Sequence, residues 1–348
     1  MNKRVAVVGA GIVGACTAWA LARRGVDCTL YERNQPMGET SRASSKLLHG
    51  GLRYLETGQF RLVGKALHAR TDWLKLAPHL CHRLEMLLPM YRDKGRPQFV
   101  ISAGIRIYDM LALGSGFPRA RLLKPSAVLA LQPGLSAKGL VGAWAFFDAQ
   151  MDDFALGNWV IEQFRTLGGK LVTGHEIRDL APLDGYHRIV NATGPWVMQL
   201  RKTLPGTPSH QLDWVRGSHI VLDRPCPAAM LLEVPGSSRI FFVLPYKGRT
   251  LIGTTEVRQP GPDNPGPSED EIRYLLDAHN HYLAPAALRG DVVDAFSGVR
   301  PLLRSADNPS EATREWAFER TGKVLHIYGG KWTTAQLQGE EAAHRVLQ

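Results

Sequence analysis

The stretch that decides the fold runs from residue 4 to residue 32 and reads RVAVVGAGIVGACTAWALARRGVDCTLYE. A β-branched run, a run of small and apolar residues and a second apolar run predict a strand, a helix and a strand within about 30 residues. Gly9, Gly11 and Gly14 stand at the first turn in the spacing GxGxxG, and an acid, Glu32, closes the second strand. This order predicts a unit of the dinucleotide-binding type.

Each of these groups has a physical task in such a unit. Small residues let the backbone approach a pyrophosphate at a helix N-terminus, where the helix dipole favours an anion. The carboxylate of Glu32 can accept hydrogen bonds from a ribose. The basic start and apolar run of residues 1–22 also imitate a secretory signal peptide. A signal peptide does not explain the three glycines and the acid, so we prefer the nucleotide-binding unit.

Composition narrows the class of ligand. The 348 residues are 44% hydrophobic and 21% charged, as in a folded protein with room for two domains. The net charge is +10, and residues 1–130 contain 20 basic and 8 acidic residues. This surplus suits an anionic cofactor or substrate, an anionic membrane surface or nucleic acid. Because the basic residues stand at motifs and form no basic run, we expect an anionic small molecule.

Two further observations concern the compartment. The four cysteines show neither CxxC pairs nor metal-ligand spacing, which predicts reduced thiols and no metal site. No run of about 18 apolar residues follows the N-terminal stretch, so no membrane-spanning helix is expected. A cytoplasmic protein is therefore expected.

The remaining patterns extend the fold. Residues 83–147 are mixed, residues 212–256 alternate and predict a β-meander, and FSGVRPLL at 296–303 predicts a buried glycine-proline turn. The other expected elements are helices at about 60–82, 152–169 and 269–283, strands at 170–174 and 187–196, and a strand, a Gly-Gly turn and a helix over 324–347.

These elements predict an α/β (α+β two-domain) fold, with a Rossmann-like domain and an antiparallel β-sheet domain for the substrate. The nucleotide-binding domain is expected to be discontinuous, taking residues 1–85, 148–213 and 296–348. The substrate-binding domain would take residues 86–147 and 214–295.

Several longer segments resemble one family. They are VVGAGIVGA, SSKLLHGGLRYLETGQFRLV, APHL, MDDFAL, VNATGPWV, RGSHIVL, FFVLPY, LIGTTEV, SGVRPLL and GGKWTT, spread over nearly the whole chain. This set resembles the FAD-dependent glycerol-3-phosphate dehydrogenases of the aerobic respiratory and oxidase type, within the D-amino-acid-oxidase-like (DAO) flavoprotein superfamily. The resemblance implies a FAD-binding domain of the glutathione-reductase/DAO type, FAD as the cofactor and a small phosphorylated substrate.

The resemblance also implies which residues contact the flavin. In the family, the segment at 40–56 passes along the cofactor. Amides at the start of the helix after Gly329 and Gly330 could stabilise an anionic reduced flavin. The expected cofactor-binding residues are Gly9, Gly11, Gly14, Glu32, Arg33, Ser41, Ser44, Ser45, Lys46, His49, Gly50, Gly51, Ala192, Thr193, Gly194, Gly298, Arg300, Gly329, Gly330, Lys331, Trp332 and Thr333.

Oxidation of a secondary alcohol needs a base for the hydroxyl proton and a cation for the substrate's anion. His219 and His49 are the two candidates for the base, with His219 preferred because the family's corresponding strand lines the substrate side. The alternative interpretation of each histidine is a core residue that donates to a backbone carbonyl. The alternative interpretation of Arg300 is a surface arginine paired with an acid. The expected catalytic residues are His219, His49 and Arg300, and the expected substrate-binding residues are Arg53, Tyr54, Arg300 and Lys331.

Three functions follow, in order of preference. The first is oxidation of sn-glycerol 3-phosphate to dihydroxyacetone phosphate by hydride transfer to FAD. The second keeps the fold and flavin but oxidises an amino acid, another amine or a 2-hydroxy acid, whose carboxylate Arg300 would hold. The third is a basic protein that binds nucleic acid, and the absence of a basic stripe interleaved with aromatic residues argues against it.

The sequence departs from the family pattern in three places. It ends after the helix that follows GGKWTT, where full-length members continue into a C-terminal helical domain, so a short form is expected. The connection at 171–187 is compressed, and Glu256 stands where the family has an aspartate. Oxygen, a quinone and a soluble carrier all remain open as electron acceptors. A peripheral position on the inner face of the membrane and a homo-oligomer are both compatible with the resemblance.

Overall fold

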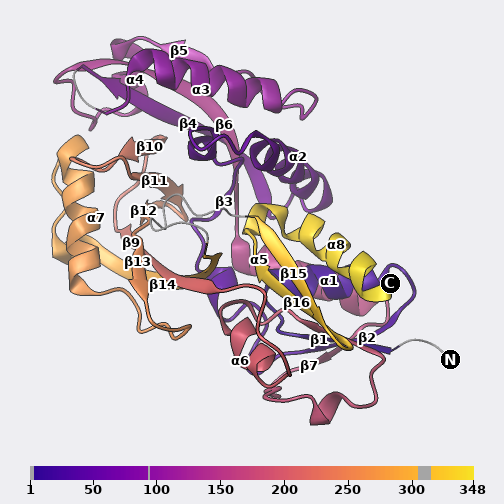
Figure 1. The fold of residues 1–348 in the computed structure, drawn as a ribbon. Helices are drawn as coiled ribbons and strands as arrows, with labels where there is room; N and C mark the ends of the chain where they lie inside the picture. The colour runs from indigo at the N-terminus through magenta and orange to yellow at the C-terminus, as the bar shows by residue number, and fades with distance from the viewer. Residues whose placement is uncertain (1–3, 93–94, 305–314) are drawn as a thin grey trace.

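The computed structural model describes residues 4–92, 95–304 and 315–348. The chain forms two β-sheets with helices packed on them (Figure 1). The first sheet has six strands in the order β15-β16-β8-β1-β2-β7, and all its pairings are parallel except that of β15 with β16. Its strands are β1 (Arg4–Val8), β2 (Asp27–Tyr31), β7 (Lys170–Val172), β8 (Arg188–Asn191), β15 (Trp316–Thr321) and β16 (Val324–Gly329).

Three helices pack together against this sheet: α1 (Ile12–Ala22), α5 (Asp153–Thr166) and α8 (Ala335–Leu347). All but one of the residues of α1 are buried, which explains why this helix is apolar on every side. A side chain at Gly14 would place its Cβ 1.8 Å from the carbonyl oxygen of Gly9, so the helix can approach the strand turn only with glycine there. The predicted strand-helix-strand unit is therefore confirmed as β1-α1-β2.

The second sheet has ten strands. Its main path runs β13-β9-β12-β11-β10-β4-β6-β3, with β14 paired to β9 and β5 to β6. The strands are β3 (Leu47–Leu48), β4 (Cys81–Tyr91), β5 (Arg121–Leu123), β6 (Leu140–Met151), β9 (Leu212–Leu222), β10 (Ala229–Glu233), β11 (Ile240–Tyr246), β12 (Arg249–Gly253), β13 (Val257–Gln259) and β14 (Val292–Leu303).

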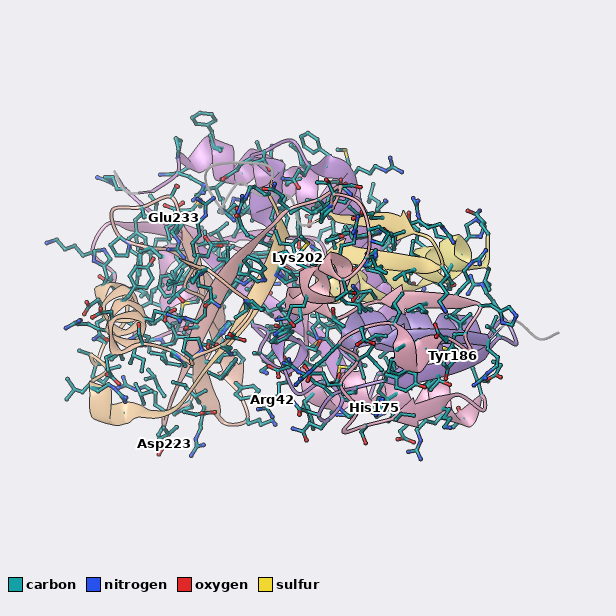
Figure 2. The ribbon with its side chains drawn as sticks, turned by 60° about the horizontal axis from the view of Figure 1, so that its bottom comes forward. Arg42, His175, Tyr186, Lys202, Asp223 and Glu233 are labelled. Carbon is teal, nitrogen blue, oxygen red and sulfur yellow. The ribbon has the colours of Figure 1, made fainter. Side chains whose placement is uncertain are left out.

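Helices cover both faces of this larger sheet. One apolar cluster joins it to α4 (Pro125–Leu131) and α7 (Glu269–Tyr282), and another joins it to α2 (Phe60–Leu76) and α3 (Gln98–Leu111). Figure 2 labels His175 and Tyr186 on the side of the six-stranded sheet and Asp223 and Glu233 on the side of the ten-stranded one. A short helix, α6 (Val197–Lys202), follows β8. A membrane-spanning helix of sufficient length and hydropathy is absent from the described residues.

Most of the expected elements are present. Asp152 caps α5, accepting a hydrogen bond from the backbone N–H of Ala155, as its position before the helix predicts. The predicted helix at 60–82 is shorter and ends at Leu76, two residues before Pro78. The four cysteines are free, as expected.

Two expectations about the second sheet are corrected, and one region that the sequence left unassigned contains regular elements. Residues 83–147, for which no element was predicted, contain β4, α3, β5, α4 and β6. The meander prediction missed β10, and β9 pairs with β12 and β14 instead of with its chain neighbour. The turn predicted around Arg300 is wrong, because FSGVRPLL is part of β14, which pairs with β9 up to Leu303. The division of the chain into two domains at the expected residues stays a prediction.

Candidate active site

Two cavities meet where the two sheets come together. The first, of about 400 Å³, is a groove along the carboxyl ends of β1, β2 and β8. The second, of about 260 Å³, is a pocket beside β9, β12 and β14. Both are lined by Thr40, Pro301, Gly330, Lys331 and Trp332. The shared residues make the two cavities neighbours, so one elongated ligand can extend from the groove into the pocket.

The groove has the groups that a dinucleotide needs. The oxygens of Glu32 accept hydrogen bonds from the N–H groups of Ala10 (2.9 Å) and Asn34 (3.0 Å), which hold the carboxylate at the end of β2. The N–H of Ile12 at the start of α1 donates to Ser41 Oγ over 2.9 Å. The expected cofactor-binding residues that line the groove are Gly9, Gly11, Glu32, Arg33, Ser41, Ala192, Thr193, Gly194, Gly329, Gly330, Lys331 and Trp332.

These residues fit the adenosine diphosphate part of FAD. A helix N-terminus and a glycine-lined wall suit the pyrophosphate, and a fixed carboxylate suits a ribose. The guanidinium of Arg33 lies 4.0 Å from the centroid of the Trp196 ring, and Trp196 lines the same groove. His175, which sequence reasoning did not select, also lines it and lies 5.8 Å from the Tyr31 ring.

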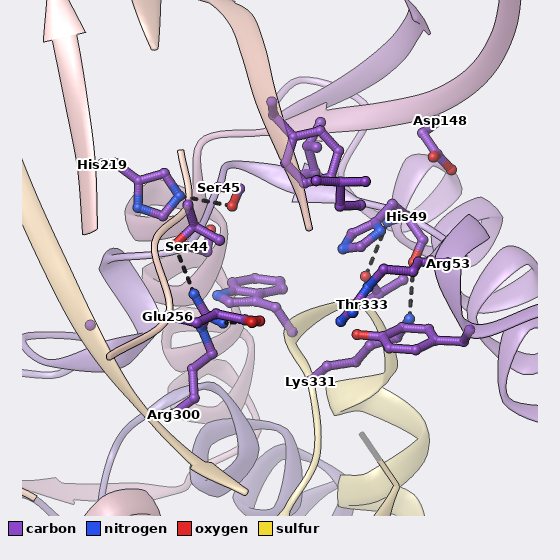
Figure 3. Close-up of a pocket in the computed structure, with 18 of the residues that line it drawn as sticks. Ser44, Ser45, His49, Arg53, Asp148, His219, Glu256, Arg300, Lys331 and Thr333 are labelled. Atoms are coloured by element: carbon purple, nitrogen blue, oxygen red, sulfur yellow. Dashed lines mark hydrogen bonds and ion pairs between the residues drawn. The ribbon is translucent and has the colours of Figure 1, made fainter. Parts of the chain in front are cut away.

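The pocket gathers side chains from distant parts of the chain. In Figure 3, His219, Ser45, Glu256 and Arg300 lie on one side, and His49, Arg53, Thr333 and Lys331 lie on the other. The expected site residues that line this pocket are Ser44, Ser45, His49, Gly51, Arg53, Tyr54, His219, Gly298, Arg300, Gly330, Lys331, Trp332 and Thr333.

Arg300 is held in place by the residues between β12 and β13. Its Nη2 donates to Thr254 Oγ1 over 2.7 Å and to the carbonyl oxygen of Thr255 over 3.1 Å. Its Nη1 lies 3.4 Å from Glu256 Oε1. A Cβ at Gly217, on the adjacent strand β9, would lie 1.8 Å from Nη2, so the guanidinium occupies the space that this glycine leaves open. The strand pairing thus positions a planar cation at the pocket wall.

His219 is packed in a similar way. Its ring is stacked on Phe296, with centroids 5.0 Å apart, and its Nε2 lies 2.8 Å from Ser45 Oγ. A Cβ at Gly253 would lie 2.0 Å from the ring, so this position also has to be glycine. Burial, followed by the positive charges of Arg300 and Lys46, lowers the pKa of His219 well below its usual value. The imidazole is therefore neutral at physiological pH, and it borders the pocket.

The opposite wall comes from the segment that contains His49. The backbone N–H of His49 donates to Thr333 Oγ1 over 3.1 Å, and Lys331 Nζ donates to the carbonyl oxygen of Gly50 over 3.0 Å. Lys331 also lies 5.3 Å from the centroid of the Tyr54 ring. These contacts join the turn after β16 to the residues before α2, and they place Lys331 between the groove and the pocket.

A buried polar network behind this wall was not predicted. Tyr108 Oη accepts the N–H of Gly50 over 2.8 Å and donates to Asp148 over 2.8 Å. The guanidinium of Arg70 is 2.6 Å from the same carboxylate. Burial raises the pKa of both Asp148 and Tyr108. The network fixes the backbone at Gly50, and no local motif marks it because its members lie on four different segments.

Three expected cofactor residues line neither cavity in the described structure. Gly14 and Gly50 are covered by packing. The Lys46 ammonium is buried and lies 2.8 Å from Asp153, which also accepts a hydrogen bond from Ser44 Oγ. These residues shape the site from behind its walls.

The pocket carries a surplus of positive charge. Among the described residues that line it, the cations are Arg53, Arg239, Arg300 and Lys331, and the carboxylates are Asp148 and Glu256. Asp148 is paired with Arg70 behind the pocket, so Glu256 is the carboxylate that remains to balance the four cations of the lining. Arg239 was not selected from the sequence, because an arginine at the start of a strand has no distinguishing signal. The arrangement favours an anionic ligand.

Comparisons with known proteins agree with this geometry. The aerobic glycerol-3-phosphate dehydrogenase of Escherichia coli (strain K12) is 34% identical, over 99% of this chain and 73% of the relative. The mitochondrial glycerol-3-phosphate dehydrogenase SDP6 of Arabidopsis thaliana is 33% identical, over 99% of this chain and 60% of the relative. The chain thus spans between about half and three quarters of the length of the curated relatives that it matches.

Solved structures match the fold over the whole chain. The glycerol-3-phosphate dehydrogenase of Bacillus halodurans, solved as a complex with FAD, has a TM-score of 0.78 and 23% identity, covering 100% of this chain and 64% of that one. This likeness confirms the predicted fold class. The pattern described as FAD dependent oxidoreductase (DAO) matches residues 4–345. With nearly the full chain matched and a groove that fits the cofactor, the protein belongs to the DAO family of FAD-dependent oxidoreductases.

Proposed function

We propose that this protein oxidises sn-glycerol 3-phosphate to dihydroxyacetone phosphate. The observation that carries the proposal is the cluster of Arg53, Arg239, Arg300 and Lys331 around a pocket that adjoins the nucleotide groove. A phosphate dianion needs such a concentration of cations, and a guanidinium can bind two of its oxygens at once. The names of the relatives support the same substrate.

FAD, when bound, accepts the hydride that leaves the carbinol carbon. The chain has to bind the substrate's phosphate, orient the carbinol and remove the hydroxyl proton, which leaves as the C–O bond becomes a carbonyl. Arg300 binds the phosphate, aided by Arg53 or Lys331. His219 is our first candidate for the proton acceptor, since it is neutral and borders the pocket. His49, on the opposite wall, is the second candidate.

The test is reduction of the bound flavin in the absence of any acceptor. Purified protein should release FAD on acid treatment, and sn-glycerol 3-phosphate should bleach the flavin absorbance in a stopped-flow experiment under anaerobic conditions. Glycerol, D- and L-amino acids and 2-hydroxy acids are the comparison substrates. Bleaching by a carboxylate substrate, with none by glycerol 3-phosphate, would replace the proposal by the second function.

The proposal includes peripheral contact with a membrane. Phe99 is 75% exposed, and Met110, Leu113 and Leu122 are each 59% exposed, on α3 and the segment that follows it. The same segment carries the exposed basic residues Arg106, Arg119 and Lys124. Cosedimentation with anionic vesicles but not with neutral ones would support this contact. The electron acceptor is identified in a separate experiment, in which a quinone or oxygen is supplied to the reduced protein and reoxidation of the flavin is measured.

A further inference from the structure

Glu256 is the feature of the pocket that the proposed reaction does not use. It follows β12, and its side chain is 13% exposed. Oε1 lies 3.4 Å from Nη1 of Arg300, and Oε2 lies 3.6 Å from Nε of Arg239. The carboxylate therefore lies between two guanidinium groups in the wall of the pocket, where a substrate's anion is expected to bind.

Both contacts are longer than a good charge-assisted hydrogen bond, which is about 2.7–2.9 Å. Arg300 itself is held by its shorter bonds to Thr254 and Thr255. Displacing the carboxylate therefore leaves Arg300 in place. Arg239, close to the other oxygen, can keep the displaced carboxylate paired, because the end of a glutamate side chain can rotate with little strain.

The other carboxylate in the pocket wall behaves differently. Asp148 is bound by Arg70 and Tyr108 at 2.6 and 2.8 Å, so its charge is compensated from behind the wall. Glu256 is paired with Arg300 and Arg239, both of which line the pocket. An anion that binds Arg300 has to compete with Glu256, and a stronger anion competes better.

We propose that Glu256 is a specificity-determining residue that competes with the substrate's anion for Arg300 and thereby selects a phosphate dianion over a carboxylate. A dianion gains more from the guanidinium than a monoanion does, so it displaces Glu256 while a monocarboxylate does not. Arg239 receives the displaced side chain. This inference rests on the proposed function, since it concerns the substrate of the same pocket.

The test is a titration that needs no turnover. Isothermal titration calorimetry of the holoenzyme measures the Kd of inorganic phosphate and of acetate for the parent and for Glu256→Gln. We expect Glu256→Gln to lower the Kd of phosphate by about fivefold, the size that a partly exposed ion pair supports, and to make acetate binding measurable. Arg239→Gln should change the Kd of phosphate in the opposite direction, because Glu256 then pairs with Arg300 alone.

The double variant separates this role from a structural one. In the Glu256→Gln background, Arg239→Gln should lose the part of its effect that acts through Glu256, and only the direct loss of one pocket cation should remain, so the two substitutions should not be additive. Glu269, the first residue of α7, forms an exposed ion pair with Arg289, so Glu269→Gln is the matched control and should leave the Kd of phosphate unchanged. Melting temperature and FAD content verify that each variant is folded, and Glu256→Asp provides a second variant that retains the charge.

The outcomes are distinct from those of the proposed function. Equal phosphate affinity in the parent and in Glu256→Gln would overturn the inference, even if glycerol 3-phosphate reduces the flavin. Additive effects of the two substitutions would overturn it as well. Tighter phosphate binding by Glu256→Gln in a protein that glycerol 3-phosphate does not reduce would support the competition and refute the proposed substrate. Where turnover is observed, the change should fall on KM rather than on kcat.

Discussion

The nucleotide groove and the pocket beside it are built in opposite ways. The core of the groove comes from one continuous segment, β1-α1-β2, whose glycines and Glu32 act through backbone contacts within 30 residues of one another. In the pocket, the pairing of β9 with β14 brings His219 and Arg300 together, whereas Arg53 and Glu256 come from segments outside the strands. The comparison teaches that a steric requirement leaves a local sequence pattern, whereas an electrostatic cluster assembled across a sheet does not.

The largest expected effect concerns the groove. Gly14→Ala places a Cβ 1.8 Å from the Gly9 carbonyl oxygen, and backbone cannot move aside without separating α1 from β1. We expect the purified protein to lose its FAD or to fail to fold. At Gly11 the added Cβ would lie 3.1 Å from the movable Ser41 Oγ, so Gly11→Ala should be milder. The FAD-to-protein ratio measures both effects. A Gly14→Ala variant with full FAD content would contradict the claim that the groove depends on a steric requirement at this glycine.

The next effect concerns the pocket. Arg300→Ala removes a charge-assisted contact worth about 1.5–3 kcal/mol, so kcat/KM for glycerol 3-phosphate should fall by at least about tenfold. Arg300→Lys should restore part of this, because an ammonium lacks the planar fork. Arg304→Ala is the control and should change little, because Arg304 follows the last residue of β14 and pairs with Asp213 at the surface.

A comparison of glycerol with glycerol 3-phosphate as substrates shows whether Arg300 binds the phosphate. Without a phosphate, glycerol should be a poor substrate for the parent enzyme and nearly indifferent to Arg300→Ala. Equal losses of kcat/KM for glycerol and glycerol 3-phosphate would mean that Arg300 supports the fold or the flavin. The claim that the pocket binds its substrate through an electrostatic cluster would then be contradicted.

The smallest effect is on stability in acid. Asn191 Nδ2 lies 2.9 Å from His326 Nδ1, below the groove, and burial lowers the pKa of His326 to about 4. The unfolded chain takes up this proton near pH 6.5, so folding stability should fall as the pH drops from 6.5 toward 4, by roughly 1–3 kcal/mol. His219, with its lowered pKa, acts in the same direction.

Urea unfolding at pH 7 and at pH 4.5 measures this loss. His326→Gln retains a hydrogen-bond acceptor for Asn191 but does not titrate, so its stability should decline less over the same interval. An identical decline in the parent and the variant would show that other groups cause the acid sensitivity.

Sequence reasoning was successful where local rules apply. The GxGxxG turn, the helix and Glu32 follow from the periodicity of apolar residues and from the close backbone approach that requires glycine. The cap at Asp152 follows because the first backbone N–H groups of a helix need a hydrogen-bond acceptor. It failed over residues 83–147, where β6 is buried along most of its length and therefore shows no alternation, β4 is buried in an irregular pattern, and α3 exposes large apolar side chains such as Phe99 and Met110. The turn predicted at Arg300 was wrong because the glycine and proline lie in a strand whose partner is β9, far earlier in the chain, with Arg300 opposite Val215.

The sequence by itself determined the nucleotide-binding unit, the class of cofactor and the identity of most charged groups near the site. Those depend on neighbours in the chain, where the geometry of a helix or strand converts spacing directly into position. The tertiary structure alone decided which charges meet. Gly217 and Gly253 leave room for Arg300 and His219 only because β9 lies between β12 and β14. Arg239 and Glu256 pair because β11 and β12 are neighbours in the sheet, and that pairing arises from packing over the whole domain.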